Sequence, residues 1–444
     1  MTEQDNSLKN LLKSKGITTH NNDRFKKFGI LFNPFPRSGI SDLNSSDFII
    51  SKLEPIDPDV KSGINEFVID SLFPNNPNST DNYLSTVIRG EYGYGKTQTL
   101  LYAKYLLDSF KEEKEYHKNP YVVYIDTPGA KLTELIGSII SQIGDENFKR
   151  YLWNIVIAKI AKDANVRDQL LGFIPRGYSL FDNDDIDPFS PVNTVNYKNF
   201  IDGWLKYLNL NPKKKKEFQD LLKTHIISAF TTEFENSTVS LYFYELLSEN
   251  IGINKTWEIL TSGNAKDLDK KEVFVIRAIG KLIKSQGFTD FYILVDEFEN
   301  VTAGRLTTAE IDRYVTNLRA LIDKERNWCS LFAMTGFALD RLKGVSPPLA
   351  DRISGRILDL KPLNLERAKL ISVNYLNLAR EESSSSITPF DEQGIEKIRD
   401  LSNGILRVFL KSCYSLIQRA SEELNENETI NSTFVSKHFQ IEEE

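Results

Sequence analysis

Four short apolar runs along the chain have the composition of buried β-strands. They are LSTVIR (84–89), PYVVYID (120–126), FYILVD (291–296) and CSLFAMT (329–335). Apolar runs of this length are typical of strands in a parallel sheet that is covered on both faces. Segments with helical spacing of apolar residues follow the first three runs, for example KTQTLLYAKYLLDSF after the first. The alternation predicts an α/β fold built on a parallel sheet.

The patterns between these runs divide the chain into four parts. A polar, Asn-rich leader is followed by a docking segment, in which Phe28, Leu31, Phe32 and Phe35 are predicted to anchor the chain on the α/β core. Helical patterns without a strand run separate the second strand from the third, which predicts a helical insertion. The predicted boundaries are 1–63 for the leader and docking segment, 64–144 and 268–361 for the α/β core, 145–267 for the insertion, and 362–444 for a C-terminal helical lid.

Composition is typical of a globular protein of two or three compact units. Of the 444 residues, 40% are hydrophobic and 26% are charged. The formal net charge of -7 provides no global positive field for nucleic acid or an anionic membrane. The basic run at residues 213–216 follows a proline, so we interpret it as a solvated helix start, with a phosphate-binding patch as the alternative.

Cysteine usage and hydropathy bear on the compartment. Cys329 and Cys413 are far apart and have no zinc-ligand spacing, which favours a reducing environment. The N-terminal 16 residues lack the apolar core of a signal peptide, and no apolar run approaches the roughly 20 residues needed to span a bilayer. The sequence therefore predicts a cytoplasmic protein without membrane association.

The loop after the first apolar run matches the pattern G-x-x-x-x-G-K-[ST] of a P-loop. Backbone N–H groups of such a loop converge on phosphates, and the following helix adds its N-terminal dipole. Lys96 would neutralise β- and γ-phosphate oxygens, while Thr97 would place its hydroxyl on Mg²⁺. A glycine turn in an unrelated α/β unit is the alternative. The loop residues predicted to bind the nucleotide are Gly90, Glu91, Tyr92, Gly93, Tyr94, Gly95, Lys96, Thr97 and Gln98.

The two tyrosines of the loop are bulky for their positions. Tyr92 and Tyr94 are candidates to stack on the nucleotide or at a subunit interface, and solvent-facing packing is the plainer interpretation. No guanine-reading NKxD motif is visible, so ATP is the default nucleotide.

A pair of acids ends the third apolar run. Asp296 is predicted to hold Mg²⁺, and Glu297 is predicted to act as the general base that activates water. An apolar strand that ends in DE also arises by chance. Its occurrence downstream of a P-loop favours the catalytic interpretation.

Four further residues are candidates for contact with the γ-phosphate or for reporting its presence. Thr335 ends the fourth run and either contacts the phosphate or caps the following turn. Arg352 and Arg356 are candidates for the guanidinium that stabilises the transition state, with surface ion pairs as the alternative. Arg407 opens a helix after a glycine turn and either reaches back to the nucleotide or lies on the helix surface.

These segments resemble those of an AAA+ ATPase in content and order, in particular the initiator-like branch that includes the origin-recognition ATPases and the ExeA-like proteins. The matching segments are GEYGYGKT, FYILVDEFENV, FAMTG, LADRISGRILDL and NGILR. The roles that this resemblance implies are Walker A for Lys96 and Thr97, Walker B for Asp296 and Glu297, the first sensor for Thr335, an arginine finger for Arg352 or Arg356, and the second sensor for Arg407.

A second resemblance covers residues 255–360, about a quarter of the chain. WEILTSGNAKDL, ILVDEFENV, LRALIDKE, FAMTGF and PPLADRI are similar to segments of the ATP-binding proteins of bacterial BREX-type phage-exclusion systems. That family also implies a long insertion between the two Walker motifs. The resemblance implies a setting in antiviral defence.

The leading hypothesis is a Mg²⁺-dependent ATPase that couples ATP binding and hydrolysis to assembly with itself and with a partner protein, with DNA as a further candidate partner. The competing hypothesis is an ATP-gated interaction switch that hydrolyses slowly or only when a partner supplies the missing arginine. A third is a protein-remodelling ATPase with a helical substrate domain. The acid Glu297 favours hydrolysis.

Overall fold

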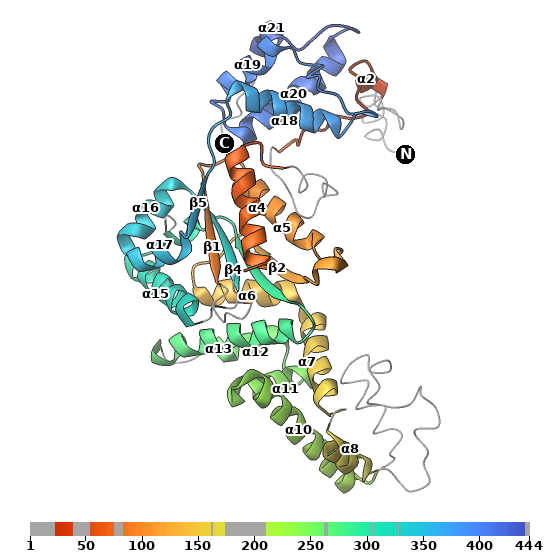
Figure 1. The fold of residues 1–444 in the computed structure, drawn as a ribbon, viewed down its shortest axis with the longest axis vertical. Helices are drawn as coiled ribbons and strands as arrows, with labels where there is room; N and C mark the ends of the chain where they lie inside the picture. Colours follow the sequence, from red (N-terminus) through yellow and green to blue (C-terminus); the bar gives the residue numbers. More distant parts are fainter. Residues whose placement is uncertain are drawn as a thin grey trace, which may run out of the picture.

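A five-stranded, all-parallel sheet forms the centre of the computed structural model (Figure 1). The structure describes residues 23–38, 54–74, 83–160, 163–173, 210–261, 265–302, 306–324, 326 and 328–439. The strands are β1 (Leu84–Arg89), β2 (Pro120–Ile125), β3 (Asp290–Val295), β4 (Cys329–Met334) and β5 (Arg356–Asp359). The α/β class and the four predicted strands are confirmed. The fifth strand was not predicted, because RILD is a short edge strand in which only Leu358 is buried.

Strand order places a crevice at the carboxyl end of β1. The order is β2-β3-β4-β1-β5, so β1 pairs with β4 on one side and with β5 on the other. The chain leaves β1 for the far edge at β2, returns through β3 and β4, and then continues beyond β1 to β5. Ligands of open α/β sheets bind outside the carboxyl ends of the strands, where the connections from two adjacent strands, here β1 and β4, run in opposite directions.

Helices cover both faces of the sheet. The side chains of Ile88, Leu294 and Leu331 pack on one face against α4 (Pro58–Leu72) and α5 (Lys96–Ser109). The alternate residues Val87 and Phe332 pack into the cluster of the opposite face. The helices of that cluster are α6 (Leu132–Ile143), α13 (Ala265–Lys284), α15 (Thr308–Lys324), α16 (Gly336–Val345) and α17 (Pro347–Ile353). A short 3₁₀ turn, η1 (Lys114–Tyr116), precedes β2.

The described part of the predicted insertion consists of helices joined by short turns, and it shares its core with the sheet. One continuous hydrophobic cluster runs from Val87 in β1 to Phe230 and Phe243 in the insertion. The predicted boundary at residue 267 falls inside α13, and residues 174–209 lie outside the described parts. The insertion helices are α7 (Asp145–Ile160), α8 (Ala164–Leu171), α10 (Pro212–Phe234), α11 (Ser237–Leu247) and α12 (Ile253–Thr261).

The C-terminal helices form a second core at the opposite end of the molecule from the insertion (Figure 1). They pack around Ile395, Phe409 and Leu416, which are all buried. The helices are α18 (Leu365–Asn377), α19 (Glu392–Leu401), α20 (Leu406–Glu423) and α21 (Ser432–His438). We refer to residues 362–439 as the lid.

The N-terminal docking segment packs on this lid, so its predicted docking on the α/β core is wrong. Phe28 and Phe35 are buried in the lid cluster, whereas Leu31 and Phe32 are 38% and 41% exposed. The Phe35 ring stacks on Tyr375 of α18 at 5.3 Å. Local apolar spacing does not reveal which of two cores a segment will cover.

Lys27, the residue after α2 (Asp23–Lys26), links the docking segment to the end of α20. The Lys27 ammonium donates a 2.9 Å hydrogen bond to the carbonyl oxygen of Ser421, where unpaired carbonyls favour a cation. Both cysteines are buried, and neither forms a disulfide bond. No helix within the described ranges has the length and apolarity to cross a membrane.

Candidate functional site

The loop between β1 and α5 wraps the N-terminus of α5. Gly93 and Gly95 have φ values of 77° and 96°, a left-handed conformation that side chains other than hydrogen adopt at a cost. Gly95 occupies the N-cap position without a side-chain hydrogen bond to the helix. The first N–H groups of α5 have no carbonyl partner within the helix, so they are available to an anion.

Lys96 folds back over the loop from the first turn of α5. It is only 7% exposed, and its Nζ donates a 3.0 Å hydrogen bond to the carbonyl oxygen of Gly90. The same ammonium lies 3.4 Å from the Oε1 of Glu299, in α14 (Glu299–Thr302). It also lies 5.0 Å from the centre of the Tyr92 ring. The predicted phosphate-binding lysine therefore already has an anionic neighbour within the chain.

Thr97 and Asp296 meet across the crevice. The Thr97 hydroxyl donates a 2.5 Å hydrogen bond to Asp296 Oδ2, and the Tyr124 hydroxyl donates to the same oxygen at 3.0 Å. Burial beside this carboxylate raises the pKa of Tyr124, which keeps it a donor. The Thr97 hydroxyl and the Asp296 carboxylate lie side by side in space, and Mg²⁺ prefers oxygen ligands of this kind. The residues present therefore fit this ion.

Glu297 stands out for its backbone conformation. Its φ is 47°, in the left-handed region that non-glycine residues rarely adopt. The side chain is exposed, and Asn300 Nδ2 donates a 3.1 Å hydrogen bond to its Oε2. Strained residues cluster at functional sites, where the surrounding structure holds them in place. The conformation singles out Glu297 as a candidate functional residue independently of any motif.

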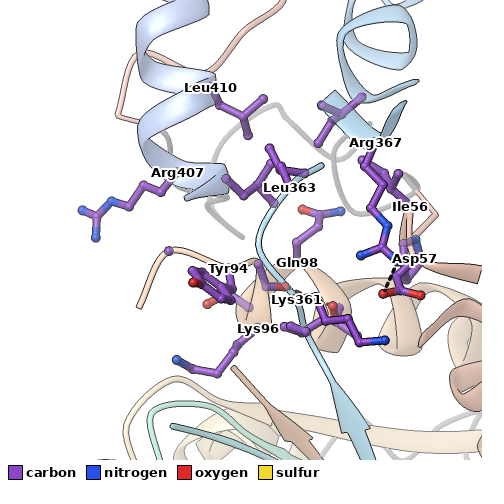
Figure 2. Close-up of a pocket in the computed structure, with 18 of the residues that line it drawn as sticks. Ile56, Asp57, Tyr94, Lys96, Gln98, Lys361, Leu363, Arg367, Arg407 and Leu410 are labelled. Carbon is purple, nitrogen blue, oxygen red and sulfur yellow. Dashed lines mark hydrogen bonds and ion pairs between the residues drawn. The ribbon is translucent and has the colours of Figure 1, made fainter. Parts of the chain in front are cut away.

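A cavity of about 240 Å³ opens beside the loop, between the α/β core and the lid. The loop residues 92–98 line it together with Asp296, Glu297 and Glu299. Its other walls come from the segment before α4, the linker from β5 to the lid, α18 and α20 (Figure 2). The apolar members of these walls include Ile56, Leu363, Ile371, Tyr375 and Leu410.

Two polar contacts hold the lid against the core around this cavity. Arg367 of α18 forms a 2.8 Å ion pair with Asp57, the N-cap of α4, drawn as a dashed line in Figure 2. The backbone N–H of Arg407 donates a 2.9 Å hydrogen bond to the carbonyl oxygen of Gly93. In Figure 2 the Arg407 side chain runs away from Leu363 and Gln98. Arg407 thus contacts the loop through its backbone N–H and the inner part of its side chain.

Three of the predicted catalytic residues, Thr335, Arg352 and Arg356, do not line this cavity. Thr335 caps α16 by accepting a 3.2 Å hydrogen bond from the N–H of Ala338, as the capping alternative predicted. Arg352 pairs with Asp323 at 2.8 Å on the exposed face of α17. Contact of these two with a γ-phosphate stays a prediction.

Arg356 lies in β5 and faces α4 rather than the loop. Its guanidinium pairs with Glu66 at 3.2 Å and donates to the carbonyl oxygen of Gly63. The surface ion-pair alternative therefore describes the contacts of Arg356, and also those of Arg352, within one chain. Of the loop tyrosines, Tyr92 is 66% exposed and Tyr94 is half-buried.

Tertiary structure adds four residues that the sequence analysis did not single out. Tyr124 is the penultimate residue of β2, next to β3, and Glu299 and Asn300 lie three and four residues beyond Asp296. Asp57 lies before the predicted start of the core, because α4 begins at Pro58 instead of residue 64. The sequence itself points to one of these four residues only through the segment DEFEN, in which Glu299 is a third acid close to the predicted pair.

Comparison with known proteins does not extend this description. No model of a protein family matches the chain, and no curated protein matches it. The site is therefore interpreted from its own geometry.

Proposed function

We propose that the chain is a P-loop ATPase of the AAA+ type, which binds ATP with Mg²⁺ at the carboxyl end of β1 and hydrolyses it. The observation that carries this proposal is the hydrogen bond between Thr97 and Asp296, residues that are 199 positions apart in sequence. It brings the end of β3 to the first turn of α5, at the crevice where open α/β sheets bind ligands.

The phosphates would lie against the N–H groups at the start of α5, with Lys96 beside the β- and γ-oxygens. Thr97 and Asp296 would hold Mg²⁺, directly or through water. The ion would supply positive charge that offsets the phosphate charge. These roles use residues whose polar atoms already converge on the cavity.

Glu297 is the proposed general base. Its carboxylate lines the cavity and is exposed, so it can receive a proton from water that attacks the γ-phosphorus. Asn300 would position this carboxylate through its 3.1 Å hydrogen bond. Glu297 would take a proton from the attacking water as the water oxygen bonds to the γ-phosphorus. The bond between the γ-phosphorus and the departing ADP would break in the same step.

The apolar side of the cavity is the proposed site of the nucleotide base. Ile56 from the segment before α4, and Ile371 and Leu410 from the lid, would cover its faces. A base in this position would contact both the core and the lid. Nucleotide binding would therefore favour one arrangement of the lid, which is the proposed link between nucleotide state and assembly.

Assembly with further copies, a partner protein and DNA in an antiviral setting is proposed on the sequence resemblance alone. The exposed Arg352 on α17 suits a guanidinium delivered to a neighbouring copy. Arg367 and Arg407 are the two arginines that line the cavity within the described residues.

The test measures ATP binding and hydrolysis by the purified chain, with and without duplex DNA. Lys96→Ala is expected to lose ATP binding while keeping its fold by circular dichroism. Glu297→Gln is expected to bind ATP and lose turnover. A Lys96→Ala protein with full ATP affinity would overturn the proposal.

An ATP-gated switch is the second candidate. It is favoured by the ion pairs of Arg352 with Asp323 and of Arg356 with Glu66, which hold both guanidinium groups outside the cavity of their own chain. Tight ATP binding with turnover near zero, unchanged by Glu297→Gln, would select the switch over the ATPase.

A further inference from the structure

Glu299 is a buried acid at the phosphate loop that the proposed reaction does not use. Its side chain is 2% exposed, and its Oε1 lies 3.4 Å from the Lys96 ammonium. Neither of its carboxylate oxygens accepts a well-formed hydrogen bond from the described residues. A buried carboxylate in this situation depends on its counter-ion, because desolvation disfavours the charged form.

Glu299 has charged neighbours of both signs. Lys96 is the favourable neighbour, and Asp296 is an unfavourable one. Burial raises the pKa of the Glu299 carboxyl, while Lys96 opposes that shift. Loss of the Lys96 contact would therefore leave only the backbone N–H of Glu299 itself to favour the negative charge, against burial and Asp296.

The contacts of Lys96 show what phosphate binding would require. An ammonium has three donor hydrogens, and Lys96 already donates to the carbonyl oxygens of Gly90 at 3.0 Å and of Glu91 at 3.5 Å. Contact with two phosphate oxygens would draw the ammonium away from Glu299. The phosphates would also bring further negative charge toward a buried carboxylate, where the low dielectric strengthens repulsion.

We propose that Glu299 competes with the β- and γ-phosphates for Lys96 and so lowers the affinity of the site for phosphate-rich nucleotides. The inference rests on the proposed function. It makes Glu299 a positioning residue: it holds Lys96 when no phosphate is present and must be displaced when phosphate binds.

Competition predicts a selective effect of charge removal. Glu299→Gln keeps the size of the side chain and removes its charge. We expect it to tighten binding of ATP and ADP about tenfold, since a tenfold change is about 1.4 kcal/mol and contacts to buried charges reach this size. Affinity for AMP, which has no β-phosphate, is expected to stay within about twofold, a difference too small to reflect a lost charge contact.

The measurement is isothermal titration calorimetry with ATP, ADP and AMP at constant Mg²⁺ and ionic strength. Inorganic tripolyphosphate serves as a probe that has no base, and it should follow ATP. Glu366→Gln, a neutralised glutamate that is 83% exposed on the lid, controls for the change in net charge. An equal change for all ligands, or no change, overturns the inference while leaving ATP binding intact.

A second experiment tests the pair without any nucleotide. Lys96→Met is expected to lower the thermal unfolding temperature of the wild-type chain, because Glu299 loses its counter-ion. The same substitution in the Glu299→Gln chain should lower it less. Equal shifts in the two backgrounds overturn the inference. A different outcome is that the wild-type chain binds no ATP, while Lys96→Met shifts the unfolding temperature unequally in the two backgrounds. That outcome would overturn the proposed function and keep the energetic link between Lys96 and Glu299.

Discussion

The backbone N–H of Arg407, at the start of α20, donates a 2.9 Å hydrogen bond to the carbonyl oxygen of Gly93 in the glycine loop between β1 and α5. A methyl group on Gly93 would lie 2.7 Å from the side chain of Ile405 and 3.1 Å from that of Arg407. The first turn of the lid helix therefore rests directly on the loop. A ligand that moves the loop must move or reshape this contact.

Gly93→Ala is expected to disturb the contact between loop and lid. The substitution combines a φ of 77° with a methyl group that meets Ile405, so we expect a loss of about 1 to 3 kcal/mol of stability, the range of overpacked and strained positions. Thermal unfolding and ATP titration would measure it.

Gly287→Ala is the matched control for this prediction. Its φ is 87°, and a methyl group there would meet nothing within 4 Å. It should therefore cost stability through backbone strain alone and leave ATP affinity unchanged. Equal effects of the two substitutions on ATP affinity would contradict a special role for the loop contact.

Asn300→Ala is expected to slow ATP hydrolysis without weakening ATP binding. The side chain donates to Glu297 Oε2, so its loss would leave the base less well positioned. We expect kcat to fall about tenfold, against about a hundredfold or more for Glu297→Gln, because a general base contributes at least that much. Steady-state kinetics would separate kcat from KM, and a rise in KM at constant kcat would count against the positioning role.

The ion pair between Arg367 and Asp57 is expected to stabilise the contact of the lid with the core. Asp57 is 7% exposed, so Arg367→Met would leave a buried carboxylate without its cation and destabilise the chain by about 1 to 3 kcal/mol. Adding Asp57→Asn should recover part of this loss. Thermal unfolding of both single variants and the double variant gives the coupling, and additive effects would show that the pair is not energetically linked.

Glu299 is expected to make stability depend on pH. Its pKa is raised in the folded chain from an ordinary value of 4.5, so the folded state binds the proton more tightly than the unfolded state. Its contribution to stability is therefore largest below pH 4.5 and is lost as pH rises through the folded pKa. Glu299→Gln should be more stable than the wild-type chain at neutral pH, with a difference that shrinks toward pH 4.5. A difference that is constant between pH 4 and pH 8 would show that titration of Glu299 is not involved.

Local pattern accounts for the central strands and for the order of the elements. Apolar runs such as FYILVD identify buried strands because a strand covered on both faces excludes polar side chains along its length. The edge strand β5 escaped prediction because an edge strand tolerates polar residues, such as Arg356 and Asp359 at its ends. The docking segment was assigned to the wrong core because its phenylalanines show that it is buried, without showing against what.

The sequence by itself determined the glycine loop, the strand that leads into it and the acids Asp296 and Glu297, since these depend on neighbouring residues and on backbone conformation. Only the tertiary structure decided that Thr97 meets Asp296, that Lys96 meets Glu299 and that the lid rests on Gly93. Such contacts join segments up to 314 residues apart, as between Gly93 and Arg407. They depend on how the cores pack together, which periodicity along the chain does not encode.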